Sequence, residues 1–403
     1  MIQGPPRALD VLFVGILPPH PGGGAISGGE LVLGLVGRGH AVRALAPITE
    51  EAARAGDVFA RRHPELALTR FSVSRFHCGP ITPASEAYRR REEEEQVHRR
   101  VESLLEERRP DVIFVGRETY AASVAPIAAR WRLPFVLRLP GSVSLGVLQG
   151  QCPPELASSI LDGFRAASAL VSPGRHLAEL VRARGIDPVA VIPTAVDLGQ
   201  FAPQPKDGRL LHALGIPPGA VVIAHVSNLK AVKRPLDLVR SAVEALRREE
   251  RLIYLVVGDG SLRPRMERTC REAGIHDRFR FVGWVDYPEM PRYLNLVDVL
   301  VMPSESEALA RVYVETQACG RALLASDIPA AREVIVDGES GLLFRPGDIA
   351  DLTAKALRLA AAPELRAEIG RTARARIGGH GLDRAVAAYE RVLRGVVQRP
   401  PAA

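Results

Sequence analysis

Short apolar runs recur along the chain, and most are apolar at nearly every position. They are "DVLFVGI" (10–16), "AVRALA" (41–46), "DVIFVG" (111–116), "FVLRL" (135–139), "ALVSP" (169–173), "VAVIP" (189–193), "AVVIAHVS" (220–227), "LIYLVVG" (252–258), "RFRFVG" (278–283), "VDVLVMP" (297–303), "ALLAS" (322–326) and "GLLF" (341–344). Longer amphipathic segments, such as 30–38 and 119–132, separate them. Runs that are apolar on both faces are typical of strands in parallel sheets covered by helices. The pattern therefore predicts an α/β fold.

The strand and helix rhythm stops once and then restarts. Residues 197–220 are rich in Pro and Gly and poor in strand signal, and a chain of 403 residues is too long for one ordinary core. We therefore predict two doubly wound lobes, residues 1–203 and 204–375. A final segment, 376–403, would carry a helix from about Leu382 that packs back on the first lobe. Ligands of such sheets bind at the carboxyl ends of the strands, so two facing lobes would form a binding cleft.

Composition narrows the classes of partner. The net charge is +7, but arginine is spread along the whole chain, which argues against a dedicated nucleic-acid surface. The charged run at 88–110 mixes signs at helical spacing and indicates a solvated helix face. No apolar run approaches the roughly 18 residues of a membrane span, and the first twenty residues resemble a first strand rather than a signal peptide.

The cysteines give a consistent indication of the compartment. Four scattered cysteines without a C-x-x-C pair indicate reduced thiols, so we expect a cytoplasmic protein. Peripheral contact with the inner face of a membrane stays open, and the sequence gives no indication of the oligomeric state.

Cations and carboxylates follow two strands of the second lobe. Lys230 and Lys233, two of only four lysines, come just after its first strand, and lysine suits a diphosphate. Glu307 precedes a helix expected over 309–318, and Glu315 lies about two turns into it. Such a helix N-terminus favours phosphate, and carboxylates accept hydrogen bonds from vicinal hydroxyls. A solvated loop, with one capping and one exposed glutamate, explains the same spacing.

The first lobe offers a glycine-rich loop, Gly22, Gly23 and Gly24, after its first strand. Ser27 could cap a helix beginning near Gly28 and so bring backbone N–H groups close to a phosphate or sugar, although a flexible turn is the simpler interpretation.

The chain has no G-x-G-x-x-G fingerprint, no P-loop, no D-x-D and no clustered His or Cys ligands. We therefore expect no metal and no cofactor. A ligand that suits the predicted positions has sugar hydroxyls, two phosphates and a ribose, and a nucleotide sugar has all three.

Several motifs in order resemble one family. They are "GGG" (22–24), "GHAV" (39–42), "IPTAVD" (192–197), "VGDGSLR" (257–263), Glu307 and Glu315 in an E-x7-E spacing followed by "ACG" (318–320), and "REVIVDGESGLLF" (332–344). Over nearly the whole chain, this series resembles the retaining glycosyltransferases of family 4, of the group 1 type. The resemblance implies the GT-B fold, with two Rossmann-like parallel-sheet lobes facing across a cleft.

The resemblance also implies roles for individual residues. Lys233 would hold the donor diphosphate with Lys230 as a second cation, Glu307 would contact the transferred sugar, and Glu315 the nucleotide ribose. The remaining donor-side positions are Asn228, at the place of a family arginine, the backbone near Gly283 and Trp284, which would meet the base, and Leu309, Ala310 and Arg311 at the helix N-terminus. The acceptor would enter near Gly22 to Gly24 and Arg138, Pro140 and Gly141. The stretch "HVSNLKAVKR" (225–234) also resembles bacillithiol-pathway N-acetylglucosaminyl-malate synthases, which slightly favours UDP-GlcNAc over a GDP-sugar.

The chain departs from the family pattern at three places. Asn228 replaces an arginine, Ala308 and Ala310 replace glycines, and Pro140 replaces a histidine near the reacting centre. We expect a retaining, metal-independent glycosyltransferase that acts on a hydroxyl acceptor in glycan, glycolipid or metabolite biosynthesis. One alternative is a catalytically inactive binding or scaffold subunit, which Pro140 favours. Another is a nucleotide-sugar epimerase or phosphorylase of the same fold.

Overall fold

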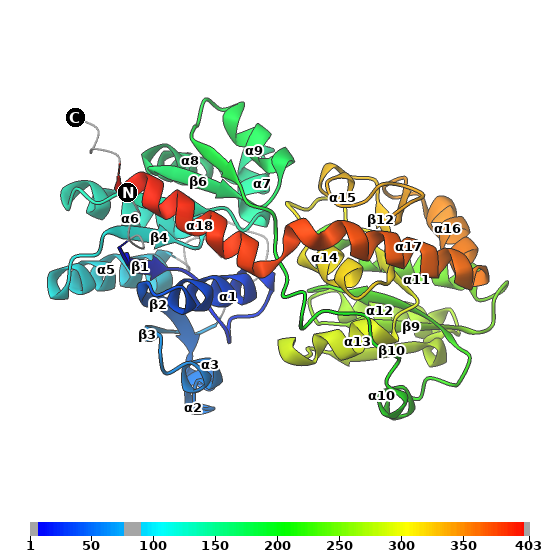
Figure 1. Cartoon of the computed structure of the whole chain (residues 1–403). Coiled ribbons are helices and arrows are strands. Elements are labelled where there is room, and N and C mark those ends of the chain that lie inside the picture. Colours follow the sequence, from blue (N-terminus) through cyan, green and yellow to red (C-terminus); the bar gives the residue numbers. More distant parts are fainter. Residues whose placement is uncertain (1–6, 76–89, 399–403) are drawn as a thin grey trace, which may run out of the picture. The chain divides into compact units, whose positions relative to one another are not determined.

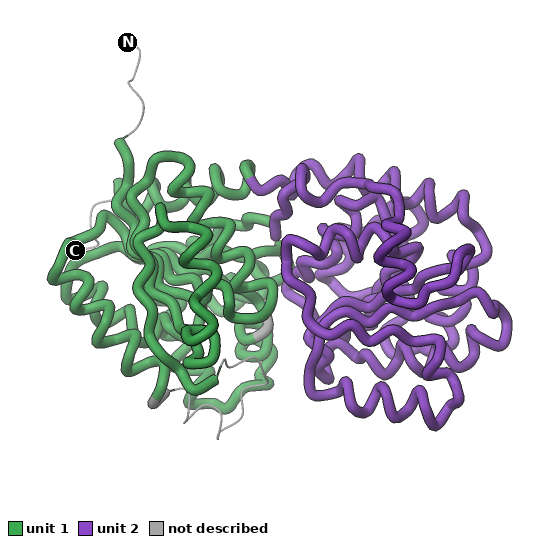
Figure 2. Tube along the Cα trace, turned by 90° about the horizontal axis from the view of Figure 1, so that it is seen from below, with its two compact units in different colours: residues 1–193, 383–403 green, residues 194–382 purple. Residues whose placement is uncertain are grey.

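The chain divides into two compact units. The computed structural model describes residues 7–75 and 90–398. Unit 1 comprises Met1–Pro193 with Asp383–Ala403, and unit 2 comprises Thr194–Leu382 (Figure 2). The sequence placed the boundaries at 203/204 and 375/376. Unit 2 begins earlier and ends later than that, because Phe201 and Ile377 are both buried in its core.

The described part of unit 1 is built on a seven-stranded parallel sheet in the order β3-β2-β1-β4-β5-β6-β7. Its strands are β1 (Asp10–Val14), β2 (Ala41–Thr49), β3 (Ala67–Val73), β4 (Val112–Val115), β5 (Phe135–Arg138), β6 (Ala169–Ser172) and β7 (Val189–Val191). The apolar runs of the sequence predicted these strands except β3, "ALTRFSV". Since β3 lies at the edge of the sheet, most of its residues are partly or fully exposed, and it lacks the continuous apolar signal.

The helices of unit 1 connect its strands, apart from the last one, which comes last in the chain (Figure 1). They are α1 (Gly23–Gly37), α2 (Glu50–Arg54), α3 (Val58–Arg62), α5 (Glu95–Glu107), α6 (Ala121–Arg130), α7 (Ser142–Leu148), α8 (Pro154–Ala166), α9 (Arg175–Arg182) and α18 (Leu382–Val397), with the π-helical turn η1 (Arg90–Glu94) and the 3-10 turn η2 (Glu118–Tyr120). Helix α1 begins at Gly23, earlier than the predicted Gly28. The predicted cap was wrong, because Ser27 lies inside the helix and donates to the carbonyl of Gly23 at 2.6 Å.

The C-terminal helix α18 packs in unit 1. Val386 lies so close to α1 that a Cβ on Gly34 would come within 2.5 Å of it. Arg38 donates to the carboxylate of Glu390 at 2.6 Å. Burial by itself would raise the pKa of Glu390, but hydrogen bonds from Arg38 and Arg394 outweigh it and hold the pKa at about 2. The carboxylate therefore stays charged, and it anchors α18 to the end of α1.

Unit 2 is built, over its described residues, on a six-stranded parallel sheet in the order β10-β9-β8-β11-β12-β13. Its strands are β8 (Val221–Val226), β9 (Leu252–Val257), β10 (Phe279–Gly283), β11 (Val299–Met302), β12 (Ala322–Ser326) and β13 (Leu342–Phe344). The helices are α10 (Gly208–Ala213), α11 (Pro235–Ala245), α12 (Arg263–Glu272), α13 (Met290–Leu296), α14 (Arg311–Ala318), α15 (Pro329–Arg332), α16 (Ile349–Ala361) and α17 (Pro363–Arg376), with the 3-10 turns η3 (Ala231–Lys233), η4 (His276–Arg278), η5 (Tyr287–Glu289) and η6 (Ile377–His380).

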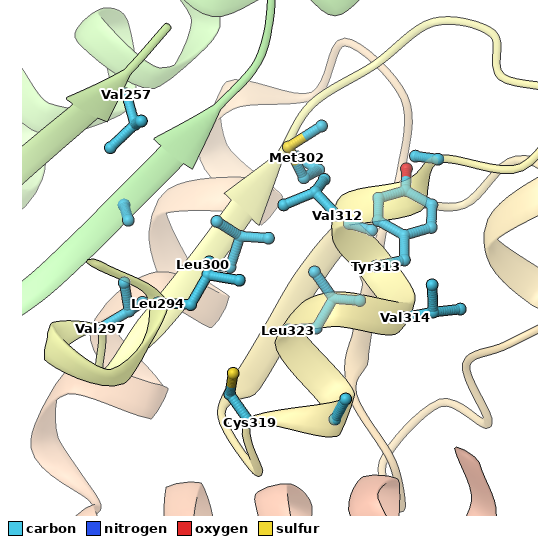
Figure 3. Packing of buried hydrophobic residues seen from close by; sticks show 14 of the residues in the cluster. Val257, Leu294, Val297, Leu300, Met302, Val312, Tyr313, Val314, Cys319 and Leu323 are labelled. Carbon is cyan, nitrogen blue, oxygen red and sulfur yellow. The ribbon is translucent and has the colours of Figure 1, made fainter. Parts of the chain in front are cut away.

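Both faces of the unit 2 sheet are buried, as the continuous apolar runs predicted. Val222 and Ala224 of β8 belong to a hydrophobic cluster with α13 and α14. Val221 and Ile223 alternate with them and belong to a second cluster with α11, α12 and α16. Figure 3 shows part of the first cluster, where Met302 at the end of β11 lies next to Val312 of α14. This contact fixes α14 beside the carboxyl end of β11, where Glu307 also lies.

Other expectations from composition concern the thiols and the membrane. Cys270 and Cys319 are free cysteines, and burial raises the pKa of both thiols to about 12. Cys78 and the first two residues of the charged run at 88–110 lie outside the described residues. Within the described ranges, no helix is both long enough and apolar enough to cross a membrane.

Candidate active site

The strand order of unit 2 brings two loops to one crevice. β8 lies between β9 and β11, so the chain leaves β8 toward one edge of the sheet and later returns on its other side. Ligands of open parallel sheets bind at the carboxyl ends of the strands where the order reverses in this way. The loops that follow β8 (227–234) and β11 (303–310) therefore flank the expected binding position in this unit.

Each of these two loops contributes one member of an ion pair. Nζ of Lys233 lies 2.5 Å from Oε1 and 2.6 Å from Oε2 of Glu307. The hydroxyl of Ser304 donates to Oε1 of Glu307 at 2.8 Å, and the backbone N–H of Glu305 donates to the carbonyl of Val232 at 2.8 Å. The side chains of the pair are 19% and 8% exposed, so both charges are largely removed from water. The structure thus brings the two predicted residues together.

A buried histidine supports the loop that carries Lys233. His225 on β8 is fully buried, and burial lowers its pKa to about 4, so the ring is neutral near pH 7. Nδ1 lies 3.0 Å from the carbonyl of Val301 and Nε2 lies 2.8 Å from the hydroxyl of Ser227. The proton therefore belongs on Nδ1, facing the carbonyl, and Nε2 accepts from Ser227. The same hydroxyl accepts from the N–H of Leu229 at 3.0 Å, which fixes the start of the loop.

A glycine turn presses against the same loop from the other side. A Cβ on Gly258 would lie 1.9 Å from the carbonyl oxygen of Ser227, and one on Gly260 would lie 2.0 Å from that of Asn228. The N–H of Gly258 donates to the carbonyl of Gly283 at 2.7 Å. Only glycine allows two backbones to approach this closely. The carboxyl ends of β8, β9 and β10 are thus joined at one place.

Asn228 and Lys230 lie where the sequence predicted, in the loop beside Lys233, and both are partly buried. The side-chain oxygen of Asn228 is buried without a hydrogen-bond partner among the described residues. Leu229 between them has φ 39°, in the left-handed region that non-glycine residues rarely adopt. The loop is therefore held in a strained conformation next to the ion pair.

The N-terminus of α14 lies in the loop that carries Glu307. The helix begins at Arg311, slightly later than predicted, and its N-cap residue Ala310 forms no side-chain capping bond. Leu309 and Ala310 are buried, and the hydroxyl of Thr194 lies 3.4 Å from the carbonyl of Leu309. The first N–H groups of α14 are thus not satisfied by a cap side chain, and they carry the positive end of the helix dipole. This end of the helix suits a phosphate group.

Glu315 lies one turn inside α14, paired with an arginine. Nε of Arg311 donates to Oε1 of Glu315 at 2.7 Å, and both side chains are below 9% exposure. Nε of Arg311 also donates to the hydroxyl of Tyr287 at 3.1 Å. Sequence reasoning placed Arg311 and Glu315 at the site but did not predict this pair or the contribution of Tyr287.

Gly283 and Trp284 follow β10 at the same edge of the sheet. Gly283 has φ 81°, in the left-handed region, and a Cβ there would lie 3.3 Å from a guanidinium nitrogen of Arg263. The side chain of Trp284 is 56% exposed, unusual for so large an apolar group. An exposed indole at the carboxyl end of a strand is accessible to a planar ligand, and contact of this segment with the base stays a prediction.

In unit 1 the strand order reverses between β1 and β4, and the predicted acceptor residues gather beside that point. The backbone turns into α1 at Gly22, which has φ 102°. A Cβ on Gly24 would lie 3.6 Å from Cβ of Pro140, and Arg138 donates to the carbonyl of Gly24 at 3.2 Å and also to the hydroxyl of Ser27. Gly141, with φ 127°, leads into α7. The glycine loop and residues 138–141 thus form one surface.

Sequence reasoning missed a buried polar cluster just after β4. Arg117 donates to Glu93 at 2.6 Å, and the hydroxyl of Tyr120 donates to the same carboxylate oxygen at 2.8 Å. Next to it, Glu118 accepts from the N–H and the hydroxyl of Ser144, both at 3.1 Å. Two charged residues directly after the apolar run "DVIFVG" were the available signal. Glu93 was interpreted as part of a solvated helix face, but it is 1% exposed.

Metal ligands are a separate question. In the parts of the chain that the structure describes, no three His, Cys, Asp or Glu side chains lie close enough to hold a metal ion. Metal independence therefore stays a prediction for this chain.

Two family models match the two halves of the chain. The model of the glycosyl transferase 4-like domain matches residues 22–195, and the model of glycosyl transferases group 1 matches residues 209–376. Together they include the loops described above in both units.

Curated relatives carry one recurring name. A D-inositol 3-phosphate glycosyltransferase from Xylanimonas cellulosilytica is 30% identical over 292 residues, which are 68% of this chain and 69% of that protein. A protein of the same name from Streptomyces bingchenggensis is 31% identical over 66% of this chain and 64% of its own length. D-inositol 3-phosphate glycosyltransferase 2 from Catenulispora acidiphila is 31% identical over 60% of this chain and 61% of its own length. The matched region thus spans less than two thirds of the latter two relatives.

Solved structures share the fold at low sequence identity. HepE from Anabaena, solved with UDP and glucose, matches with a TM-score of 0.79 and 16% identity over 96% of this chain and 100% of its own. Sucrose-phosphate synthase from Thermosynechococcus elongatus matches with a TM-score of 0.81 and 19% identity over 96% and 99%. These similarities support the fold predicted from the sequence.

Proposed function

This chain belongs to the family 4 glycosyltransferases of the group 1 type, and we propose that it moves a sugar from a nucleotide-diphosphate sugar to a hydroxyl acceptor with retention of configuration. The observation that carries this proposal is the Lys233–Glu307 pair at 2.5 Å, at the strand reversal of unit 2 and beside the uncapped N-terminus of α14. A cation, a carboxylate and a helix N-terminus in one place suit a sugar attached to a diphosphate.

Charge stabilisation would provide most of the catalysis. As the bond to the diphosphate breaks, negative charge grows on the leaving phosphates and the anomeric carbon gains oxocarbenium character. Lys233, Lys230 and the N–H groups at Arg311 would stabilise the leaving charge in a preorganised, partly desolvated site. Glu307 would orient the sugar and hold Lys233 in place. The acceptor hydroxyl would attack from the face that the diphosphate leaves and pass its proton to a donor phosphate oxygen, without metal and without a protein nucleophile.

The donor and the acceptor are finer proposals. We favour a UDP-sugar, with UDP-GlcNAc as the first candidate. The recurring name of the relatives makes an inositol phosphate the first acceptor to test. Unit 1 would bind the acceptor beside Gly24, Arg138 and Pro140, where the guanidinium of Arg138 reinforces the glycine loop. Cytoplasmic location and peripheral membrane contact remain predictions, which cell fractionation and vesicle sedimentation would test.

Calorimetric titration with UDP and with GDP, each with and without EDTA, tests the donor site. We expect one nucleotide to bind and EDTA to leave its affinity unchanged. A tenfold loss of affinity in EDTA would contradict metal independence, and binding of neither nucleotide would contradict the donor site itself.

A turnover assay with inositol phosphate then separates the alternatives. Transfer of the sugar supports the proposal. Nucleotide binding without turnover on any acceptor supports a scaffold subunit, and an altered sugar nucleotide formed without an acceptor supports an epimerase.

A further inference from the structure

The guanidinium of Arg311 has a role of its own beyond the backbone position of this residue at the start of α14. Arg311 and Glu315 are four residues apart on one helix, where side chains of opposite charge meet. Their side chains are only 8% and 6% exposed, unlike most such pairs on helix surfaces. A carboxylate buried to this extent without a cation would be strongly unfavourable. Arg311 therefore allows a charged carboxylate to exist at position 315.

The guanidinium is also held from a second side. Tyr287 accepts a hydrogen bond from Nε of Arg311 at 3.1 Å, and its ring centre lies 4.8 Å from the guanidinium carbon. The ring of Tyr287 in turn packs against that of Phe201 at 5.4 Å between centres. A cation held over an aromatic ring and bonded to its hydroxyl has few alternative positions. The arrangement thus fixes Arg311, and Arg311 fixes Glu315.

The contact to Glu315 is made at its carboxylate. Arg311 donates from Nε to Oε1 of Glu315. A fixed carboxylate can accept hydrogen bonds from hydroxyl groups in a defined direction. Nucleotide discrimination then depends on the residue that sets this direction as well as on Glu315 itself.

We propose that Arg311, backed by Tyr287, is a positioning residue that orients Glu315 toward the ribose hydroxyls and so makes the site selective for ribonucleotides. This inference rests on the proposed function, which places the nucleotide ribose at Glu315. Compensation of the carboxylate charge also removes a repulsion between Glu315 and the donor diphosphate nearby.

Calorimetry with UDP and with 2′,3′-dideoxy-UDP, which lacks both ribose hydroxyls, tests the proposal. GDP and its dideoxy form replace them if guanine is the base that binds. We expect the wild-type protein to prefer the ribonucleotide by at least about tenfold, since each hydrogen bond to a charged group contributes appreciably. In Arg311→Met the preference should fall to within about threefold, chiefly through weaker binding of the ribonucleotide.

Two further variants support the comparison. Arg394→Met removes a matched Arg–Glu pair, four residues apart on α18, in which Nε of Arg394 lies 2.9 Å from Oε1 of Glu390, and it should leave the preference unchanged. Tyr287→Phe keeps the ring and removes the hydroxyl, and it should reduce the preference partly. If Arg311→Met does not fold, the preference measured in Tyr287→Phe tests the proposal in its place.

The outcomes separate this inference from the proposed function. If Arg311→Met weakens both nucleotides equally and keeps the preference, the pair is structural and the inference is wrong. If the wild-type protein binds both forms equally, Glu315 does not recognise the ribose and the inference is also wrong. If the wild-type protein binds neither UDP nor GDP, the proposed function fails and this inference fails with it.

Discussion

Nζ of Lys233 lies within 2.6 Å of both carboxylate oxygens of Glu307, although 74 positions separate them in the chain. They come from loops on opposite sides of the strand reversal, after β8 and after β11. Each charge compensates the burial of the other, so a substitution at either residue changes the electrostatics of both. The two residues are therefore best tested as a unit.

Replacement of Lys233 by alanine should lower turnover at least about tenfold, which corresponds to roughly 1.4 kcal/mol of barrier. The lysine would stabilise the leaving diphosphate, and the other side chain that bonds Glu307, that of Ser304, carries no charge. Steady-state kinetics with saturating donor measure the effect.

Lys206→Ala is the matched control for this experiment. It removes another lysine ion pair of unit 2, in which Nζ lies 2.5 Å from Asp298, just before β11 and away from the carboxyl ends. Its turnover should stay within about twofold of wild type, because pairs outside the site contribute little to catalysis. An unchanged rate in Lys233→Ala would remove this lysine from the mechanism.

Replacement of Glu307 by glutamine should separate binding from turnover. The amide keeps the shape of the side chain and can still accept from Ser304, but Lys233 loses its anionic partner. Affinity for UDP should rise by about twofold or more, because Lys233 no longer shares its charge. Turnover should fall at least about tenfold if the carboxylate orients the sugar.

Calorimetry and initial rates on the same preparations measure both quantities. Glu305→Gln, an exposed neighbour in the same loop, should change neither. A Glu307→Gln variant with wild-type turnover would show that the carboxylate only holds Lys233.

Replacement of Gly260 by alanine should destabilise unit 2 by about 2 to 3 kcal/mol, because the new Cβ would meet backbone that cannot move aside. The position would bring it within 2.0 Å of the carbonyl oxygen of Asn228. Gly378→Ala adds a Cβ with no atom within 4 Å and should be tolerated. Urea unfolding of both variants makes the comparison, and equal midpoints would contradict the close approach.

Stability should fall in acid because of His225. Burial lowers its folded pKa to about 4, whereas an unfolded histidine titrates near 6.5. Above pH 6.5 the ring is neutral in both states and contributes no pH dependence. Between pH 6.5 and 4 the unfolded state binds a proton that the folded state does not, so up to roughly 3 kcal/mol of stability is lost as the pH falls.

The test replaces His225 by asparagine, which keeps a donor for the carbonyl of Val301 but does not titrate. Melting temperatures between pH 8 and pH 4.5 should vary less in His225→Asn than in wild type. His212→Asn, at an exposed position of α10, should keep the wild-type slope. The same slope in all three proteins would mean that other groups dominate the acid sensitivity.

Most of the fold could be predicted from the sequence, since strands buried on both faces leave continuous apolar runs. The edge strand β3 could not, because Thr69, Arg70 and Ser72 interrupt the apolar residues of "ALTRFSV" and most of the strand is partly or fully exposed. The predicted start of α1 was also wrong, because the helix begins at the backbone conformation of Gly22 and not at a side-chain cap. Local conformation of glycine leaves no signal in hydrophobic periodicity.

The sequence predicted which loops carry the candidate site residues, but it did not predict which of their side chains contact one another. Lys233 and Glu307 follow predicted strands, but their pairing depends on the order of β8 and β11 in the sheet. Tyr287 reaches Arg311 from a separate turn after β10, which no spacing in the sequence indicates. Arg117 and Glu118 follow β4 at the corresponding reversal of unit 1, so the strand order would have directed attention to them.

The contact of Gly258 and Gly260 with Ser227 and Asn228 also bears on how this enzyme could be re-engineered. The turn at 258–262 and the loop at 227–234 are in backbone contact, so neither can change its conformation without the other. A loop grafted from a relative would meet a turn shaped for a different backbone. Chimeras that aim to change the donor should therefore exchange both segments together. Exchange of one segment alone should impair folding rather than change the donor specificity.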